Sequence, residues 1–246
     1  MRGCCAIPGR SLAGKTRAGG EGGGLGPRLD LPDQALYHPP VFKGLFLDFM
    51  MNGHCVTKDA SRHVVEFFED DQARYDALIA FCYPPLIRNE GVLLVVTAEH
   101  GRVLESRLRR MGLNVEAARA CGQLRVADAV SMLDSIMVQN TPDAIRFLDS
   151  VDGVLRDMVA RYSQIHIYGE MVDLLWGAQN RHAALELESL CNDLGVAYEL
   201  KIFCGYSGEY FTSPEDRGYL RELHGLHTHV VSANDRAKAC THHPQD

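Results

Sequence analysis

Glu170 is the residue of this sequence whose side chain is best placed to do chemistry. It follows one apolar segment, residues 165–168, and precedes another, residues 171–176. A carboxylate between two buried segments must be paired, protonated or in contact with a ligand. Two interpretations stay open for Glu170: a structural hydrogen bond at a helix N-terminus, and a ligand-binding or switching role.

Other acidic side chains follow two further apolar segments. Glu69, Asp70 and Asp71 come after residues 63–68, and Glu99 comes just after residues 91–97. Acidic residues are favoured in the first turn of a helix because they interact well with its dipole. We therefore interpret these four residues as ordinary helix-start acids.

Three side chains in the region after Glu170 have structural and functional interpretations. Trp176, the only tryptophan, is expected to pack on a sheet, with the wall of a ligand pocket as the alternative. Glu188 and Asn192 are four residues apart and share a helix face, where a solvated or capping pair is the preferred interpretation.

The histidines and cysteines give weak signals for a metal or redox centre. His224, His227 and His229 have spacings that suit a transition metal, but the sequence fixes no third or fourth ligand. We interpret them as surface histidines and predict no metal site. The eight cysteines contain no CxxC pair, and Cys204 lies in an apolar run where a buried, inert thiol is expected.

Signals for catalysis are also weak. Residues 9–16, GRSLAGKT, match the phosphate-loop pattern, but no buried strand precedes them and a glycine-rich segment follows. Nucleophile-elbow, HExxH and dinucleotide-binding patterns are absent from the sequence. We predict that the chain is not an enzyme and that it uses no cofactor.

The elements that must position these residues alternate between strands and helices. The patterns predict strands at 63–68, 91–97, 124–127, 165–168 and 198–204, and helices at 70–82, 99–111, 129–138, 142–162 and 171–194. Pro84 and Pro85 are expected to interrupt the first helix. The alternation predicts an α/β fold with a mainly parallel sheet covered on both faces, and a ligand site at the carboxyl ends of the strands.

Composition sets the limits of this organised region. The 246 residues carry a net charge of -7, which argues against binding to nucleic acid or to an anionic membrane surface. We predict a disordered glycine-rich extension and linker at 1–57, one domain at 58–231 and a flexible tail at 232–246. A start of translation at Met50 or Met51 is a further hypothesis. Reduced cysteines and the absence of a secretory signal favour the cytoplasm.

Across residues 60–212 the order of segments resembles the MEDS family, a sensory domain named for methanogens, methylotrophs and a dichloromethane-response regulator. The segments that carry the resemblance are His63 with Phe67-Phe68, Phe81, LLVVT at 93–97 with Glu99-His100, the helix at 104–112, GQL at 122–124 with Asp128-Ala129, Pro142-Asp143 with Phe147, GEMVDLLW at 169–176, Leu187-Glu188 with Asn192, and FCGY at 203–206. Two departures are Phe68, where many members have Tyr, and Cys191, where many have Trp.

The resemblance implies a RecA-like fold, related to circadian-clock and recombinase ATPases but commonly without their phosphate loop. At the place of that loop this sequence has Glu69-Asp70-Asp71, whose carboxylates would repel a triphosphate.

It also implies a stand-alone sensory domain that binds a small, hydrocarbon-derived molecule. His63 and Glu170 would supply polar contacts, while Phe68, Trp176 and Tyr206 would form apolar walls. The expected partner is a signalling protein such as a histidine kinase or a sigma-factor regulator. The alternatives are a ligand-free docking module, a residual ATPase and a metal-dependent hydrolase.

Overall fold

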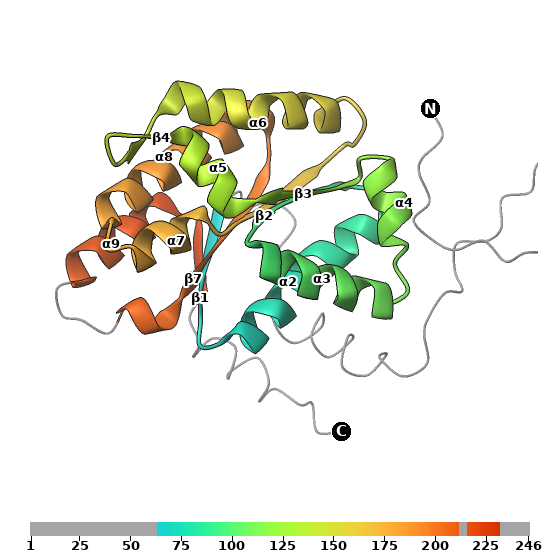
Figure 1. The fold of residues 1–246 in the computed structure, drawn as a ribbon, viewed down its shortest axis with the longest axis horizontal. Helices are drawn as coiled ribbons and strands as arrows, with labels where there is room; N and C mark the ends of the chain where they lie inside the picture. Colours follow the sequence, from blue (N-terminus) through green and yellow to red (C-terminus); the bar gives the residue numbers. More distant parts are fainter. Residues whose placement is uncertain (1–62, 212–215, 232–246) are drawn as a thin grey trace, which may run out of the picture.

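A central parallel sheet covered by helices on both faces organises the computed structural model, which describes residues 63–211 and 216–231 (Figure 1). The sheet consists of β1 (His63–Phe68), β2 (Gly91–Val96), β3 (Leu124–Asp128), β6 (Ile165–Gly169), β7 (Lys201–Ser207) and β8 (His229–Val231). The strand order is β3-β2-β6-β7-β1-β8, and every neighbouring pair is parallel. This confirms the predicted α/β class, and the architecture is consistent with a RecA-like fold.

Two helical layers enclose the sheet, and each has its own apolar core. On one face lie α2 (Asp71–Ile87), α3 (Ala98–Arg110) and α4 (Val115–Ala120). On the other lie α5 (Ala129–Ile136), α6 (Ala144–Val159), α7 (Met171–Gly177), α8 (Arg181–Tyr198) and α9 (Asp216–Leu226) (Figure 1). All six residues of β2 are buried, which explains why its sequence is apolar without alternation. A short hairpin of β4 (Met137–Val138) and β5 (Thr141–Pro142) precedes α6, and the 3-10 helix η1 (Gly208–Phe211) follows β7.

The predicted interruption at Pro84 and Pro85 is wrong, because α2 continues through both residues to Ile87. The two prolines lack backbone N–H donors, so α2 loses two hydrogen bonds there, but the fixed φ of proline is compatible with a helix. Both prolines are buried, and Leu86 beside them packs into the core under α2. The N–H of Arg88 then donates to the carbonyls of Pro84 and Pro85, at 3.1 Å each, and closes the helix end.

The predicted helix at 171–194 is two helices, and the strand after it is shifted. Gln179 adopts a left-handed conformation with φ of 62°, and the side chain of Asn180 caps the start of α8. Gly195 does not end α8. Its missing side chain allows Ile202 to pack closely on the helix. The helix ends at Glu199, which is left-handed with φ of 53°, so β7 begins only at Lys201.

Several predictions stay untested because of where they fall in the chain. The disordered extension at 1–57, the phosphate-loop match at 9–16 and the flexible tail at 232–246 lie outside the described residues. Within the described ranges, no helix combines the length and apolar character needed to cross a bilayer.

A glycine in β7 allows two aromatic rings to approach the carboxyl end of the sheet. A Cβ at Gly205 would fall 2.5 Å from the ring edge of Phe68 and would collide with the hydroxyl of Tyr168. Both rings are fully buried, so neither can move aside without repacking the core.

We predict that Gly205→Ala lowers the free energy of unfolding by about 1–3 kcal/mol, the usual cost of overpacking. Gly169→Ala is the matched control, because a Cβ at Gly169 meets nothing within 4 Å. Chemical denaturation of both variants measures the difference. Equal stability of the two variants would contradict the proposed close packing at Gly205.

Candidate functional site

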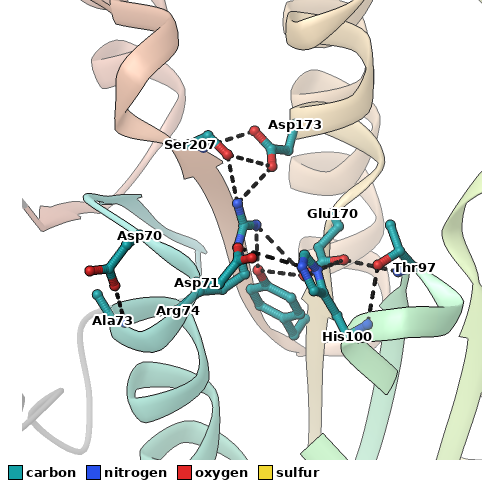
Figure 2. A network of polar contacts seen from close by, with 10 residues as sticks. Asp70, Asp71, Ala73, Arg74, Thr97, His100, Glu170, Asp173 and Ser207 are labelled. Carbon is teal, nitrogen blue, oxygen red and sulfur yellow. Dashed lines mark hydrogen bonds and ion pairs between the residues drawn. The ribbon is translucent and has the colours of Figure 1, made fainter. Parts of the chain in front are cut away.

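A buried polar network lies at the carboxyl ends of β2, β6 and β7, with Glu170 at its centre (Figure 2). The Glu170 side chain is 2% exposed. One carboxylate oxygen accepts a hydrogen bond of 2.9 Å from the backbone N–H of Thr97. The other lies 2.8 Å from Nδ1 of His100 and 3.3 Å from the hydroxyl of Tyr168. The carboxylate therefore joins the strand that precedes it to a second strand and its helix.

This arrangement corrects one of the two interpretations of Glu170. The residue does precede α7, but its side chain makes no capping hydrogen bond to that helix. Instead it reaches the start of α3, where the Thr97 hydroxyl accepts a hydrogen bond from the backbone N–H of His100. That cap starts α3 directly after β2 and thereby turns His100 back toward Glu170.

Arg74 supplies the buried positive charge of the network. It lies in the first turns of α2, which starts at the Asp70 cap after β1, and its side chain is 3% exposed. Its Nη2 donates to Asp173 and to the hydroxyl of Ser207, both at 2.8 Å (Figure 2). Its Nη1 lies 3.7 Å from Glu170. The guanidinium thus connects α2 to α7 and to the end of β7.

The outer side of the network is only partly covered. The side chain of Asp71 is 66% exposed and that of His100 is 16% exposed, and 3.6 Å separates His100 Nε2 from the Asp71 carboxylate. Beneath them, Arg74 Nε is buried without a hydrogen-bond partner, since its nearest carboxylate, that of Asp71, lies 3.7 Å away. Arg74 Nε is therefore an N–H donor without a close acceptor, and Nε2 of His100 is a second donor only when the ring is protonated.

The charges in the network alter the ionisation of its members. The hydrogen bond to Glu170 raises the pKa of His100, although partial burial acts in the opposite direction. Burial disfavours a charged Arg74, yet Tyr168 and the carboxylates of Asp173 and Glu170 outweigh that cost and raise the pKa of its guanidinium. Burial raises the pKa of Tyr168 far above its usual value, which keeps its hydroxyl a donor.

The five residues predicted to line a ligand site fall into two groups. Phe68 belongs with Glu170, because its ring packs against Arg74, whose guanidinium carbon is 5.0 Å from the ring centroid. Both residues touch Arg74 at the carboxyl end of the sheet. This group coincides with the buried polar network.

His63, Trp176 and Tyr206 form the second group, on the face of the sheet covered by α7, α8 and α9. Trp176 and Tyr206 are fully buried and pack edge to face, with ring centroids 5.5 Å apart. The Tyr206 hydroxyl donates to Glu188 at 2.7 Å, and the same carboxylate lies 3.1 Å from His63 Nε2. The core-packing interpretation of Trp176 is therefore confirmed.

Two interpretations of polar residues in this second group are wrong. Glu188 is completely buried rather than solvated, and Asn192 contacts Nδ1 of His63 at 3.0 Å. The surface interpretation is also wrong for His227, whose side chain the turn after α9 buries against Glu188. It is confirmed for His224 and His229, which are exposed. Sequence spacing could not reveal these contacts, since α8, β1 and the end of α9 are far apart in the chain.

Sequence reasoning missed Arg74 and Asp173 as members of the first group. Arg74 looks like an ordinary helix residue, and only its position one turn after Asp70 could have hinted that it faces the strand ends. Asp173 follows Glu170 by three residues, a spacing that places two carboxylates on one side of a helix start. His100 was identified at a strand end, but its partner was not.

The loop between β1 and α2 is too short to hold a triphosphate in the manner of a phosphate loop. It consists of Glu69 and Asp70 alone, and Asp70 accepts a 2.7 Å hydrogen bond from the N–H of Ala73. The helix-start interpretation of Asp70 is thus confirmed. The Asp70 carboxylate therefore already binds a backbone N–H group of the kind that a phosphate would need at the start of this helix.

The raised pKa of His100 predicts a pH-dependent contribution to stability. Because the folded pKa lies above the unfolded value of about 6.5, the contribution is complete below that pH and is lost as pH rises through the folded value. We expect His100→Gln to cost about 1.5–3 kcal/mol at pH 6 and less at pH 9.

Denaturant titrations of the wild type and variant across this range measure the effect. His182→Gln is the control, because His182 is 75% exposed on α8 and should show no such trend. A cost of His100→Gln that stays constant or grows with pH would contradict the assignment.

Comparison with known proteins agrees with this architecture. The family described as MEDS, the methanogen/methylotroph, DcmR sensory domain, matches residues 62–228, which is more than half of the chain. No protein in the curated comparison matches the chain. The match begins one residue before β1 and ends one residue before β8, so it includes the polar network and both helical layers. The chain belongs to the MEDS family of sensory domains.

Proposed function

We propose that this sensory domain detects a small apolar molecule that carries a hydrogen-bond acceptor, and that it binds this molecule at the Arg74–Glu170 network. The observation that carries the proposal is the buried Nε of Arg74, which has no hydrogen-bond partner beneath a partly open cover. An unsatisfied buried donor costs about 1–3 kcal/mol, so an acceptor that reaches it gains a corresponding advantage. A hydroxyl, carbonyl or carboxylate oxygen of a hydrocarbon derivative meets this requirement.

Aromatic rings around the network suit the apolar part of such a ligand. Tyr75 packs edge to face on His100, with ring centroids 5.6 Å apart, and Phe68 lies under Arg74. A bound molecule would displace Asp71, the most exposed member, from its contacts with His100 and Arg74. Ligand entry at this point needs no change in the buried contacts of Glu170.

Signalling requires that the ligand binds two states of the domain with different affinity. The network joins α2, α3 and α7 through single side chains, so a ligand that exchanges one contact changes how these helices are held. In the proposal a signalling protein, such as a histidine kinase or a sigma-factor regulator, recognises that difference in the cytoplasm. The domain itself carries out no reaction.

Thermal melting of the full chain against a panel of compounds tests the proposal. The panel contains short alcohols, halocarbons, monocyclic aromatics, nucleotides and divalent metals. A ligand present at about 100 times its dissociation constant stabilises by about 2.7 kcal/mol, which raises the melting temperature by about 5–10 °C. We expect such a shift with an apolar compound that carries an acceptor. A shift with nucleotides alone, or silence across the panel together with a captured protein partner, would favour the ATPase or the docking module instead.

Variants locate the site once a compound binds. Glu170→Gln keeps the shape of the side chain but removes the charge that holds His100 and Arg74, so we expect an affinity loss of at least about tenfold, or 1.4 kcal/mol. Glu116→Gln, at a carboxylate 69% exposed on α4, is the control. Calorimetric titration measures both affinities. Unchanged affinity in both Glu170→Gln and His100→Gln would show that the compound does not bind at this network.

A further inference from the structure

Four side chains from separate elements converge beneath α8 and α9, on the opposite face of the sheet from α2. They are His63 at the start of β1, Glu188 in α8, Cys204 in β7 and His227 just after α9. One nitrogen, oxygen or sulfur atom from each lies within 4.8 Å of the others. These four residues, called the His-Glu-Cys cluster below, are not used by the proposed ligand site.

The spacing inside the His-Glu-Cys cluster suits a tetrahedral metal ion. Nε2 of His63 lies 3.1 Å from the Glu188 carboxylate and 3.3 Å from the Cys204 sulfur, and Nε2 of His227 lies 3.3 Å from the same carboxylate oxygen. Nitrogen, oxygen and sulfur ligands about 2.0–2.3 Å from a tetrahedral zinc ion are about 3.3–3.8 Å from each other. The three contacts are therefore close to the edges of such a tetrahedron.

Hydrogen bonds on the far side of each imidazole direct a lone pair into the cluster. Nδ1 of His227 lies 2.7 Å from the carbonyl of Leu223, which can only accept, so this nitrogen carries the proton. Nδ1 of His63 lies 3.0 Å from the Asn192 amide oxygen, whose orientation is fixed because the amide nitrogen donates to the Leu226 carbonyl at 2.8 Å. In each neutral ring, Nε2 is then an unprotonated acceptor that faces Glu188.

Two of the facing atoms have no hydrogen-bond partner. They are Nε2 of His227 and one carboxylate oxygen of Glu188, and both are buried. Two acceptors 3.3 Å apart repel each other unless a proton or a metal cation lies between them. The thiol of Cys204 can donate to His63, but it leaves the other pair unsatisfied.

We propose that the His-Glu-Cys cluster binds one zinc ion. The mixed nitrogen, oxygen and sulfur donors are those that zinc prefers, and four protein ligands make a closed, structural site. A doubly charged cation with the carboxylate of Glu188 and the thiolate of Cys204 is electrically neutral, which suits a buried position. Binding releases the thiol proton of Cys204 to solvent, so charge and protons balance.

Outer contacts already hold the ligands in place. The Tyr206 hydroxyl donates to the Glu188 oxygen that does not face the histidines, while Leu223 and Asn192 orient the two rings. Such contacts are typical of metal sites, where they fix the ligand orientation. The ion would tie the turn after α9 to β1, β7 and α8.

Titration of Co²⁺ and Zn²⁺ into the full chain, stripped of metal and kept reduced with a non-thiol reductant, tests the proposal. We expect one ion per chain, the visible absorption of tetrahedral Co²⁺ with a thiolate charge-transfer band, and a rise in melting temperature of about 5–10 °C at 100 times the dissociation constant. Retention of far less than one ion per chain would overturn the proposal.

Variants separate this site from adventitious binding by other cysteines and histidines in the chain. Cys204→Ser should abolish the thiolate band, whereas Cys121→Ser, at the distant end of α4, should keep it. Asn192→Ala, which leaves all four ligands present, should weaken Co²⁺ affinity about 10–100-fold. A thiolate band that persists in Cys204→Ser would place the metal elsewhere. These outcomes are distinguishable from those of the organic compounds in the panel, because the two sites share no side chain; a melting shift with divalent metals alone reports on the His-Glu-Cys cluster and not on the Arg74–Glu170 network.

Discussion

The buried carboxylate of Glu170 is the interaction on which the carboxyl edge of the sheet depends. It is reached by the backbone of Thr97, the ring of His100, the hydroxyl of Tyr168 and the charge of Arg74, which come from three separate segments: the start of α3, β6 and α2. A charge removed from water survives only where partners of this kind surround it. Glu170 therefore ties the start of α3 to the end of β6, while Arg74, beside it, ties α2 to α7 through Asp173.

The parallel sheet explains why these segments can meet at all. Four consecutive neighbours in the sheet, β2, β6, β7 and β1, end at the same edge. The first residues after each of these strands therefore lie close together. In proteins with a phosphate loop that edge receives phosphate, a role that needs a flexible loop rich in glycine. Here the loop after β1 consists of Glu69 and Asp70, and the cation at this edge, Arg74, is engaged by Asp173 and Glu170. An internal carboxylate thus occupies the electrostatic role that a bound anion would have.

Much of the fold could be predicted from sequence because its strands are short apolar runs with clear ends. β1 was placed at its true bounds, and β2, β3 and β6 within one residue. The errors arose where tertiary contacts outweigh local preference: buried packing carries α2 through Pro84 and Pro85, and Gly195 serves a close approach to Ile202 rather than a helix end. The residues of the candidate site were harder to predict from sequence. Burial between two apolar segments identified Glu170, but nothing local distinguishes Arg74 from a solvated helix residue, and the contact of His63 with Glu188 spans most of the domain.

Strand β7 connects the two polar centres of the domain. Its alternation sends Cys204 and Tyr206 to the face of the His-Glu-Cys cluster, while Phe203 and Gly205 face the core under α2, and Ser207 ends in the network around Arg74. A strand buried on both faces is stiff, because a shift of one residue would move every side chain to the wrong face. Both centres therefore restrain the same strand, the His-Glu-Cys cluster through one face and the network through its last residue. The 3-10 helix η1 follows this strand directly, and its Phe211 packs on Trp176 and Tyr206. In the proposed function, a change at Arg74 reaches η1 through Ser207, the residue that directly precedes η1.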